Sequence, residues 1–293
     1  MPALVEETPF FFRCQGEDLP GILASPPGPA FTGVLIVVGG PQYRVGSHRQ
    51  FVHLARHLAG NGVACMRFDY RGMGDGGGAM RAFEQIDADL RAAIDAFAAR
   101  CPLLTSVMLW GLCDGASAAC FYAATDPRVT GLVLVNPWVR TEVGEARVHL
   151  RHYYFRRLLT FGCWQKLGRG KMDLRSTAAS FLGAIRLAFR SKHAPGRNSA
   201  PPADDGDLPL PERMARRLGQ FRGRILVLLS GNDYTAKEFC QARSGSVSWA
   251  RALSGAETVL LKDADHTFSS RAWKVQVAEA TAEWVIGPRS GRA

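Results

Sequence analysis

Residues 106–117 read SVMLWGLCDGAS, and this stretch decides the expected fold. The mostly apolar run from Ser106 to Trp110 predicts a short buried strand. It is followed at once by Gly-Leu-Cys-Asp-Gly and then by small residues that can begin a helix. Gly111 and Gly115 lie two positions on either side of Cys113, which is the spacing of a nucleophile elbow with cysteine in place of the usual serine.

The glycine spacing has a mechanical reason. A strand that turns sharply into a helix strains its central residue, and the flanking positions must lack side chains to avoid a collision. The strained residue is exposed at the helix N-terminus, where the helix dipole and free N–H groups favour a thiolate. The alternative is a buried cysteine in an ordinary strand–helix turn. An elbow shifted to Asp114 would place Leu112 and Ala116 at the flanks, which is a poorer fit.

Length and composition favour one large α/β domain with an inserted subdomain, because the chain has 293 residues and 47% hydrophobic content. The first ten residues lack the apolar core of a secretory signal, and runs such as Val34–Val38 are too short to span a bilayer. Seven cysteines are scattered without C-x-x-C pairs, which predicts a reducing compartment and neither a disulfide framework nor a zinc site. We therefore expect a cytoplasmic protein without a metal or an organic cofactor.

Apolar runs and segments of helical periodicity alternate along the rest of the chain. Residues 9–28 predict an antiparallel hairpin at a sheet edge. Further strands are expected at 33–38, 63–68, 129–135, 224–229 and 257–261, and helices at 50–58, 82–99, 237–253 and 270–284. This alternation predicts a mostly parallel central sheet with helices on both faces.

Two further residues complete the set that nucleophilic catalysis needs. Asp233 follows the strand at 224–229, and His266 follows the last strand. Reactive groups belong at the carboxyl ends of parallel strands, and the order nucleophile, acid, histidine is that of α/β-hydrolases. His266 would take the proton of Cys113, while Asp233 would hold its tautomer. Asp265 is a rival for the acid, and each residue alone could be an ordinary turn, cap or surface residue.

At this point the chain resembles the α/β-hydrolase superfamily over nearly its whole length. The resemblance rests on five motifs: GGP at 39–41, FDYRGMGDG at 68–76, GLCDGAS at 111–117, SGNDYT at 230–235 and ADHTF at 264–268. The combination of GVLIVVGGPQYRVGSHRQF at 33–51 with FDYRGMGDG and GLCDGAS looks more narrowly like the exosortase A system-associated hydrolase 1 family. These are bacterial proteins associated with exopolysaccharide and protein-sorting loci. The resemblance implies Cys113 as nucleophile, Asp233 as acid and His266 as base. A cysteine nucleophile is also similar to that of the dienelactone hydrolases.

One departure concerns the oxyanion hole. Superfamily members usually have His-Gly-X after the third strand, and the N–H of X joins the hole. This chain has Gly39-Gly40-Pro41 there, and proline has no N–H. The second donor would then be Gly40 or Gln42, beside the N–H of Asp114. Three interpretations stay open: a shifted hole, weak catalysis, or a fold retained for another purpose.

The glycine-rich motif at 68–76 has two interpretations. Arg71 and Asp75 in a loop after a strand superficially suggest phosphate binding. The loop lacks the G-x-x-x-x-G-K-[ST] pattern and the third glycine of a dinucleotide fingerprint. We favour a structural loop that packs beside the elbow.

An inserted segment carries almost all of the net charge of +10. Residues 138–195 hold 12 Lys and Arg against 3 Asp and Glu, whereas the rest holds 24 against 23. We expect a core at 1–138 and 221–293, a basic helical cap at 139–197 over the active site, and a return linker at 198–220. The basic face is interpreted as a solvated surface, a peripheral contact with an anionic inner membrane face, or a site for an anionic substrate handle. Nucleic-acid binding is not expected, because no binding motif accompanies the charge.

The sequence therefore predicts a hydrolase acting on a small-molecule ester or thioester through an acyl-enzyme on Cys113. The alternatives are an acyltransferase or thioesterase acting on carrier-bound or coenzyme A-bound acyl groups, and a catalytically silent hydrolase fold that serves as a binding partner.

Overall fold

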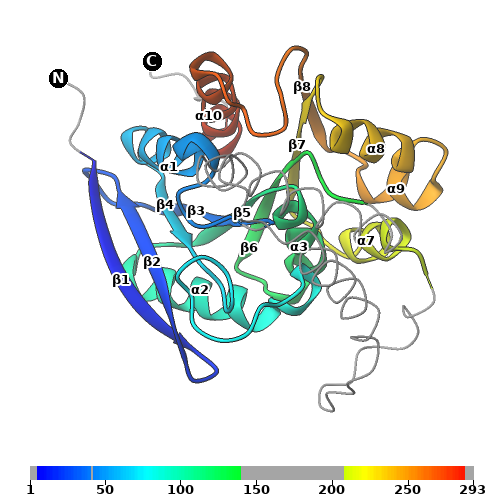
Figure 1. Ribbon diagram of the computed structural model, residues 1–293. Helices are drawn as coiled ribbons and strands as arrows, with labels where there is room; N and C mark the ends of the chain where they lie inside the picture. Colours follow the sequence, from blue (N-terminus) through cyan, green and yellow to red (C-terminus); the bar gives the residue numbers. More distant parts are fainter. Residues whose placement is uncertain (1–4, 41, 140–207, 288–293) are drawn as a thin grey trace, which may run out of the picture. The chain divides into compact units, whose positions relative to one another are not determined.

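The computed structural model describes residues 5–40, 42–139 and 208–287 (Figure 1). The chain divides into two compact units, Met1–Val139 with Leu210–Ala293, and Arg140–Pro209. Nearly all described residues belong to the first unit. The predicted cap and most of the predicted return linker fall at 140–207, outside the described residues.

One eight-stranded sheet organises the first unit, in the order β1-β2-β4-β3-β5-β6-β7-β8. The strands β3 to β8 run parallel to one another, and the β1–β2 hairpin joins β4 in antiparallel fashion. The bounds are β1 Glu6–Cys14, β2 Glu17–Ser25, β3 Thr32–Val37, β4 Ala64–Phe68, β5 Ser106–Leu112, β6 Val129–Val135, β7 Arg224–Ser230 and β8 Glu257–Leu261. The expected parallel sheet with an edge hairpin is confirmed.

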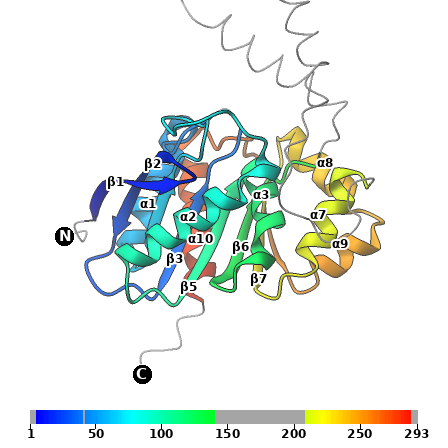
Figure 2. The same ribbon diagram turned by 90° about the horizontal axis from the view of Figure 1, so that it is seen from below.

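The helices cover both faces of this sheet. Helices α1 and α10 pack against each other on one face, and α2 and α3 lie on the other (Figures 1 and 2). The bounds are α1 Gln50–Gly60, α2 Asp87–Arg100, α3 Asp114–Tyr122, α7 Leu210–Leu218, α8 Tyr234–Arg243, α9 Val247–Ala252 and α10 Arg271–Ile286, with short 3-10 turns at Ser47–Arg49, Phe83–Gln85 and Ala123–Thr125. This layering explains why the central strands are continuous apolar runs, since both faces of each are buried.

Trp110 of β5 shows how the layers are joined. Its side chain is 1% exposed and meets the Phe51 ring of α1 edge to face, with centroids 5.6 Å apart. Its indole N–H donates to the hydroxyl of Thr281 on α10 at 3.3 Å. The strand that leads into Cys113 is therefore anchored to the two helices on one face of the sheet.

Two predicted segments differ from the structure. The expected helix at 237–253 is two helices, α8 and α9, because Gly245 between them has a positive φ of 77°. The expected linker includes α7, which packs against α3 and α9. Leu210, Met214 and Leu218 recur every fourth residue and are buried, so a helical stripe was already present in the sequence.

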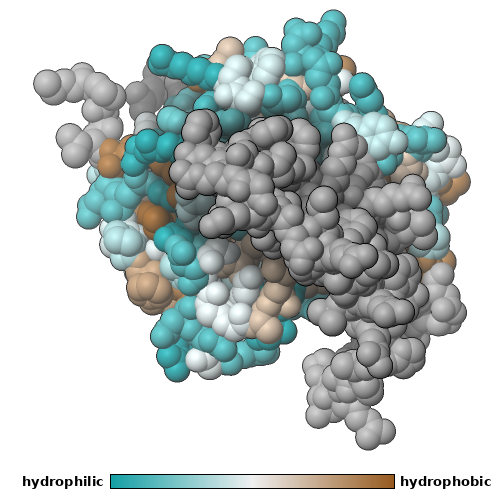
Figure 3. All heavy atoms as spheres, viewed as in Figure 1, coloured by the Kyte–Doolittle hydropathy of each residue, from teal (hydrophilic) through white to brown (hydrophobic). Residues whose placement is uncertain are grey.

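The described surface shows mainly hydrophilic residues, with hydrophobic residues visible over the β1–β2 edge in the view of Figure 3. Phe11 of β1 is 69% exposed. Among the described residues, no helix has both the length and the apolar character that crossing a membrane requires.

Candidate active site

The junction between β5 and α3 has the backbone of a nucleophile elbow. The strand ends at Leu112, the helix begins at Asp114, and Cys113 between them has φ 61° and ψ −125°. A non-glycine residue pays roughly 1–3 kcal/mol for such a conformation, so the surrounding packing must hold it in place. Cys113 is half-buried, as expected of a residue at the tip of a sharp turn.

Three glycines make this turn possible. A Cβ on Gly111 would lie 2.4 Å from the backbone of Gly115, and a Cβ on Gly115 would lie 2.4 Å from the Val37 carbonyl oxygen. A Cβ on Gly39, in the loop after β3, would lie 2.5 Å from the Leu112 carbonyl oxygen. These distances are far below van der Waals contact. The elbow and the loop after β3 therefore pack backbone against backbone.

The backbone of Cys113 is held from two sides. Its N–H donates to the Val135 carbonyl at the end of β6 at 2.9 Å. Its carbonyl accepts from the N–H groups of Ala116 and Ser117 in α3 and from that of Trp138, at 3.1 to 3.2 Å. The loop after β6 thus brackets the strained residue.

Asp233 and His266 form the second half of the candidate site. The Nδ1 atom of His266 lies 2.8 Å from Oδ2 of Asp233, a residue that is 5% exposed. The Asp233 carboxylate also accepts from the backbone N–H groups of Thr235 and Ala236, at 3.1 and 3.2 Å, as the N-cap of α8. Three donors and the N-terminus of the helix stabilise this carboxylate, so His266 donates from Nδ1 and presents Nε2 as the basic nitrogen.

Asp265, the sequence rival for the acid, has a different task. Its carboxylate accepts from the N–H groups of Thr267 and Ser269, at 3.1 and 3.0 Å, and from the Ser269 hydroxyl. Burial acts to raise the pKa of Asp265, but these hydrogen bonds outweigh it, and the pKa lies below its usual value. Asp265 therefore shapes its own loop, and Asp233 is the carboxylate that bonds to His266.

The loop after β3 contains both candidates for the second oxyanion donor, Gly40 and Gln42. The N–H of Gln42 donates to the Gly40 carbonyl at 2.8 Å, so it is engaged within the loop. The N–H of Gly40 makes no hydrogen bond within the described part of the chain. Gly40 follows the glycine that packs on the elbow, and its φ is 61°. Pro41 lies outside the described residues. Gly40 is thus a better candidate than Gln42.

The loop after β4 uses its charged residues internally. Arg71 is 2% exposed, and its guanidinium makes two hydrogen bonds to the carboxylate of Asp89, at 2.8 and 2.7 Å. Arg44 pairs with both Asp69 and Asp75, and its own N–H donates to Asp69 at 2.6 Å. These contacts tie the loop after β4 to α2 and to the loop after β3. They favour the structural interpretation of this motif over phosphate binding.

A buried polar pair beside the site was not found from the sequence. Asn136 follows β6, Ser230 ends β7, and each makes hydrogen bonds to the other and to the loop that carries His266. Asn136 is 0% exposed and Ser230 is 1% exposed. Their positions at strand ends were visible in the sequence, but the pairing joins residues far apart in the chain.

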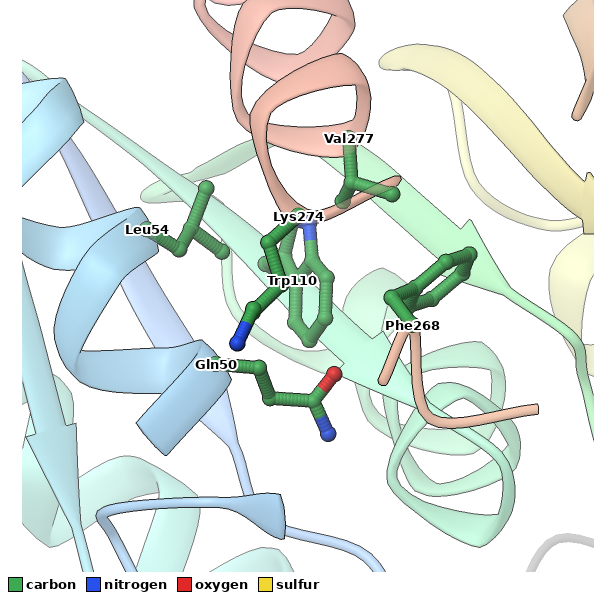
Figure 4. A pocket seen from close by; sticks show the side chains of 6 residues that line it. All are labelled: Gln50, Leu54, Trp110, Phe268, Lys274 and Val277. Atoms are coloured by element: carbon green, nitrogen blue, oxygen red, sulfur yellow. The ribbon is translucent and has the colours of Figure 1, made fainter. Parts of the chain in front are cut away.

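A small cavity lies beside the same loop, between α1, β5 and α10. Figure 4 shows the six side chains around it: Gln50, Leu54, Trp110, Phe268, Lys274 and Val277. Its volume is about 10 Å³, which is room for one water molecule. It is therefore not a substrate site.

The comparisons with known proteins agree with this architecture. A model of the family described as "serine aminopeptidase, S33" matches residues 33–172. The structure is similar to that of an esterase of Pyrococcus furiosus, with TM-score 0.66 and 14% identity over 96% of this chain and 91% of that one. No curated protein matches the sequence.

Two other solved structures are similar over most of both chains. Est1E of Butyrivibrio proteoclasticus, with ferulic acid bound, has TM-score 0.60 and 15% identity over 94% of this chain and 98% of that one. A dienelactone hydrolase of Anabaena variabilis has TM-score 0.59 and 15% identity over 96% of this chain and 97% of that one. The chain has the α/β-hydrolase fold, and the family match supports a hydrolase. The matching family is named for serine, whereas this elbow carries cysteine.

Proposed function

We propose that the protein hydrolyses a carboxylic ester or thioester of a small molecule, with Cys113 as nucleophile, His266 as general base and Asp233 as the residue that orients the histidine. The observation that carries the proposal is the conformation of Cys113. A glycine would meet the structural need of this strained position better than a cysteine, so a cysteine framed by glycines at the start of α3 indicates a role for its side chain. The Asp233–His266 hydrogen bond supports the base.

The acylation step follows from these roles. Nε2 of His266 takes the proton of Cys113, and the thiolate sulfur attacks the acyl carbon. The carbonyl electrons move to oxygen, and the backbone N–H groups of Asp114 and Gly40 are the proposed donors to that oxyanion. The carbonyl re-forms as the bond to the leaving alcohol or thiol breaks, and His266 returns the proton to that group. Cys113 then carries the acyl group as a thioester.

Deacylation uses the same groups in reverse. His266 deprotonates a water molecule that attacks the thioester, and the proton returns to the departing Cys113 sulfur. Because the acyl-enzyme is a thioester, another thiol, alcohol or amine can replace water. The acyltransferase or thioesterase alternative therefore uses the same chemistry and differs only in the acceptor or leaving group.

The link to an exosortase or exopolysaccharide system remains part of this proposal. It rests on the motifs at 33–51, 68–76 and 111–117 and implies a genomic context more than a substrate. The basic cap and its contact with an anionic membrane or an anionic substrate handle belong to residues outside the described part of the chain.

Steady-state turnover tests the proposal. The substrates are p-nitrophenyl esters of increasing acyl length and acyl-coenzyme A thioesters, assayed with and without added hydroxylamine as an acceptor. Cys113→Ala and His266→Gln should each lower turnover by about 10³-fold or more, because the triad acts as a unit. The matched control is Cys240→Ala, which removes a half-buried cysteine from α8 and should leave turnover unchanged.

Two outcomes would count against the proposal. Retained turnover in Cys113→Ala would remove the cysteine from its role. An absence of turnover across the whole panel in the wild type would favour the silent binding protein.

A further inference from the structure

We infer that Asn136, together with Ser230, is a positioning residue that sets His266 relative to Cys113. The inference rests on the proposed function and adds to it a contact between two residues, Asn136 and Ser230, that the sequence motifs do not reveal. Asn136 lies directly after β6, which neighbours both the nucleophile strand β5 and the acid strand β7.

Both the oxygen and the nitrogen of the Asn136 side-chain amide make hydrogen bonds. Its Oδ1 accepts from the backbone N–H of Ser230 at 2.8 Å, and its Nδ2 donates to the Ser230 hydroxyl oxygen at 2.9 Å. Nδ2 also makes a longer contact, 3.5 Å, with the His266 carbonyl oxygen. A backbone N–H can only donate, so the amide oxygen of Asn136 must face the N–H of Ser230. This fixes the orientation of the whole amide group.

Ser230 in turn contacts the loop that carries His266. Its hydroxyl donates to the Asp265 carbonyl at 3.0 Å. The pair therefore holds two successive carbonyls, those of Asp265 and His266, at a point where Phe268 adopts a positive φ of 51°. Because both partners are buried, these hydrogen bonds are shielded from competing water, and an unmade one would be costly.

The same segment also holds the nucleophile. Val135, one residue before Asn136, accepts the hydrogen bond of the Cys113 N–H, and Trp138, two residues after it, donates to the Cys113 carbonyl. Asn136 itself has a left-handed φ of 44° and donates its N–H to Leu228 of β7 at 3.0 Å. One short stretch of chain thus contacts the backbone of Cys113 on one side and that of His266 on the other.

A role in positioning explains why an asparagine suits this place. Asparagine tolerates the left-handed conformation better than most residues with side chains, and its amide supplies one acceptor and two donors. A glycine would keep the backbone and lose the contacts, which gives a clean variant. Small displacements of a catalytic base reduce rates strongly, and a misplacement of about 1 Å can cost about 10²-fold.

The test compares Asn136→Gly and Ser230→Ala with the wild type. The readout is the rate of iodoacetamide alkylation at Cys113 against pH, followed by peptide mapping. With His266 displaced, the midpoint of the profile should rise toward about 8.5, the value of a free cysteine, and the rate below neutral pH should fall about tenfold or more. Ser230→Thr, which keeps the hydroxyl, should restore much of the wild-type profile.

The matched control removes a buried hydrogen bond elsewhere. Thr281→Val deletes the partner of the Trp110 indole on α10, at 3.3 Å, and should leave the alkylation profile unchanged at a comparable loss of stability. A second readout does not depend on Cys113. The ¹⁵N NMR signals of His266 report whether Nδ1 stays protonated and bonded to Asp233, and Asn136→Gly should give a mixture of tautomers.

The outcomes separate the two claims. If Asn136→Gly and Ser230→Ala both kept the alkylation profile and the His266 tautomer of the wild type, the positioning role would be overturned and the proposed function would stand. A wild-type Cys113 that reacts no faster than Cys240 would overturn the proposed function, and the NMR readout would still decide whether Asn136 orients His266.

Discussion

Two glycine-rich loops follow β4 and β5, the strands on either side of β3, at the same edge of the sheet, yet they hold their side chains in different ways. The loop after β4, residues 69–78, buries Arg71 against Asp89 and Asp69 against Arg44. The elbow after β5, residues 111–115, leaves Cys113 half-buried at a strained backbone position. Glycine content alone therefore says little about chemistry. What separates the loops is that one buries charged side chains in ion pairs, whereas the other holds a half-buried cysteine at a strained backbone position.

The two loops also differ in what their structure costs. Burial raises the pKa of Asp69, against the opposing hydrogen bonds from the backbone of Asp75 and from Arg44, so this carboxyl is one that the fold holds at some cost. Such a group needs its partner to stay in place. In the elbow, the cost is instead the backbone strain at Cys113, which places the side chain of this residue at the tip of the turn.

The largest expected effect concerns two cysteines, one at the N-terminus of α3 and one inside that helix. Burial raises the pKa of Cys120 to about 12, whereas Cys113 lies at the N-terminus of α3. At pH 8 a thiol with that pKa is only about 10⁻⁴ ionised, and the thiolate is the reactive form. Peptide mapping after brief iodoacetamide treatment at pH 8 should show Cys113 alkylated at least about 10³-fold faster than Cys120. Equal rates would mean that the elbow does not expose its cysteine.

The next effect concerns the stability of the loop after β4. Arg71→Met leaves the Asp89 carboxylate buried without its guanidinium partner and should lower the free energy of unfolding by about 3–5 kcal/mol. The catalytic rate per folded molecule should stay the same, because the pair belongs to the fold and not to the chemistry. Urea denaturation and active-site titration measure the two quantities.

The control for this change is Arg13→Met, which breaks the Arg13–Asp18 pair, with side chains 69% and 58% exposed. That change should cost less than about 1 kcal/mol. A stable Arg71→Met protein with lost activity would place Arg71 in the site and reverse the comparison.

Much of the candidate site could be predicted from the sequence, because its residues lie in local patterns. Gly111, Cys113 and Gly115 form a short motif, and Asp233 and His266 follow recognisable strands. The choice between Asp233 and Asp265, and between Gly40 and Gln42, depended on where neighbouring loops meet.

The remaining parts were hidden for a different reason. Asn136 and Ser230 are 94 residues apart, and the sequence around each of them does not predict that their side chains meet. Helix α7 differs again, since Leu210, Met214 and Leu218 were visible as a stripe, but the prolines before them suggested a linker.

The smallest expected effect isolates the strain at the elbow. Cys113→Gly and Cys113→Ala both remove the thiol, but only glycine adopts φ 61° without strain. The glycine variant should be more stable than the alanine variant by about 1 kcal/mol, the relief of strain being partly offset by the greater freedom of glycine in the unfolded chain. Thermal unfolding of the pair measures the difference. A less stable glycine variant would mean that the turn stores no strain.

The central claim is that Cys113 carries the acyl group, and locating that group tests it most directly. The wild type is mixed briefly with p-nitrophenyl acetate, quenched in acid, digested and mapped by mass spectrometry, with and without neutral hydroxylamine. The account predicts acetyl on the peptide that contains Cys113, released by hydroxylamine as a thioester should be, and absent in His266→Gln over the same time. Acetyl on another residue, or none on any peptide while product accumulates, would contradict it.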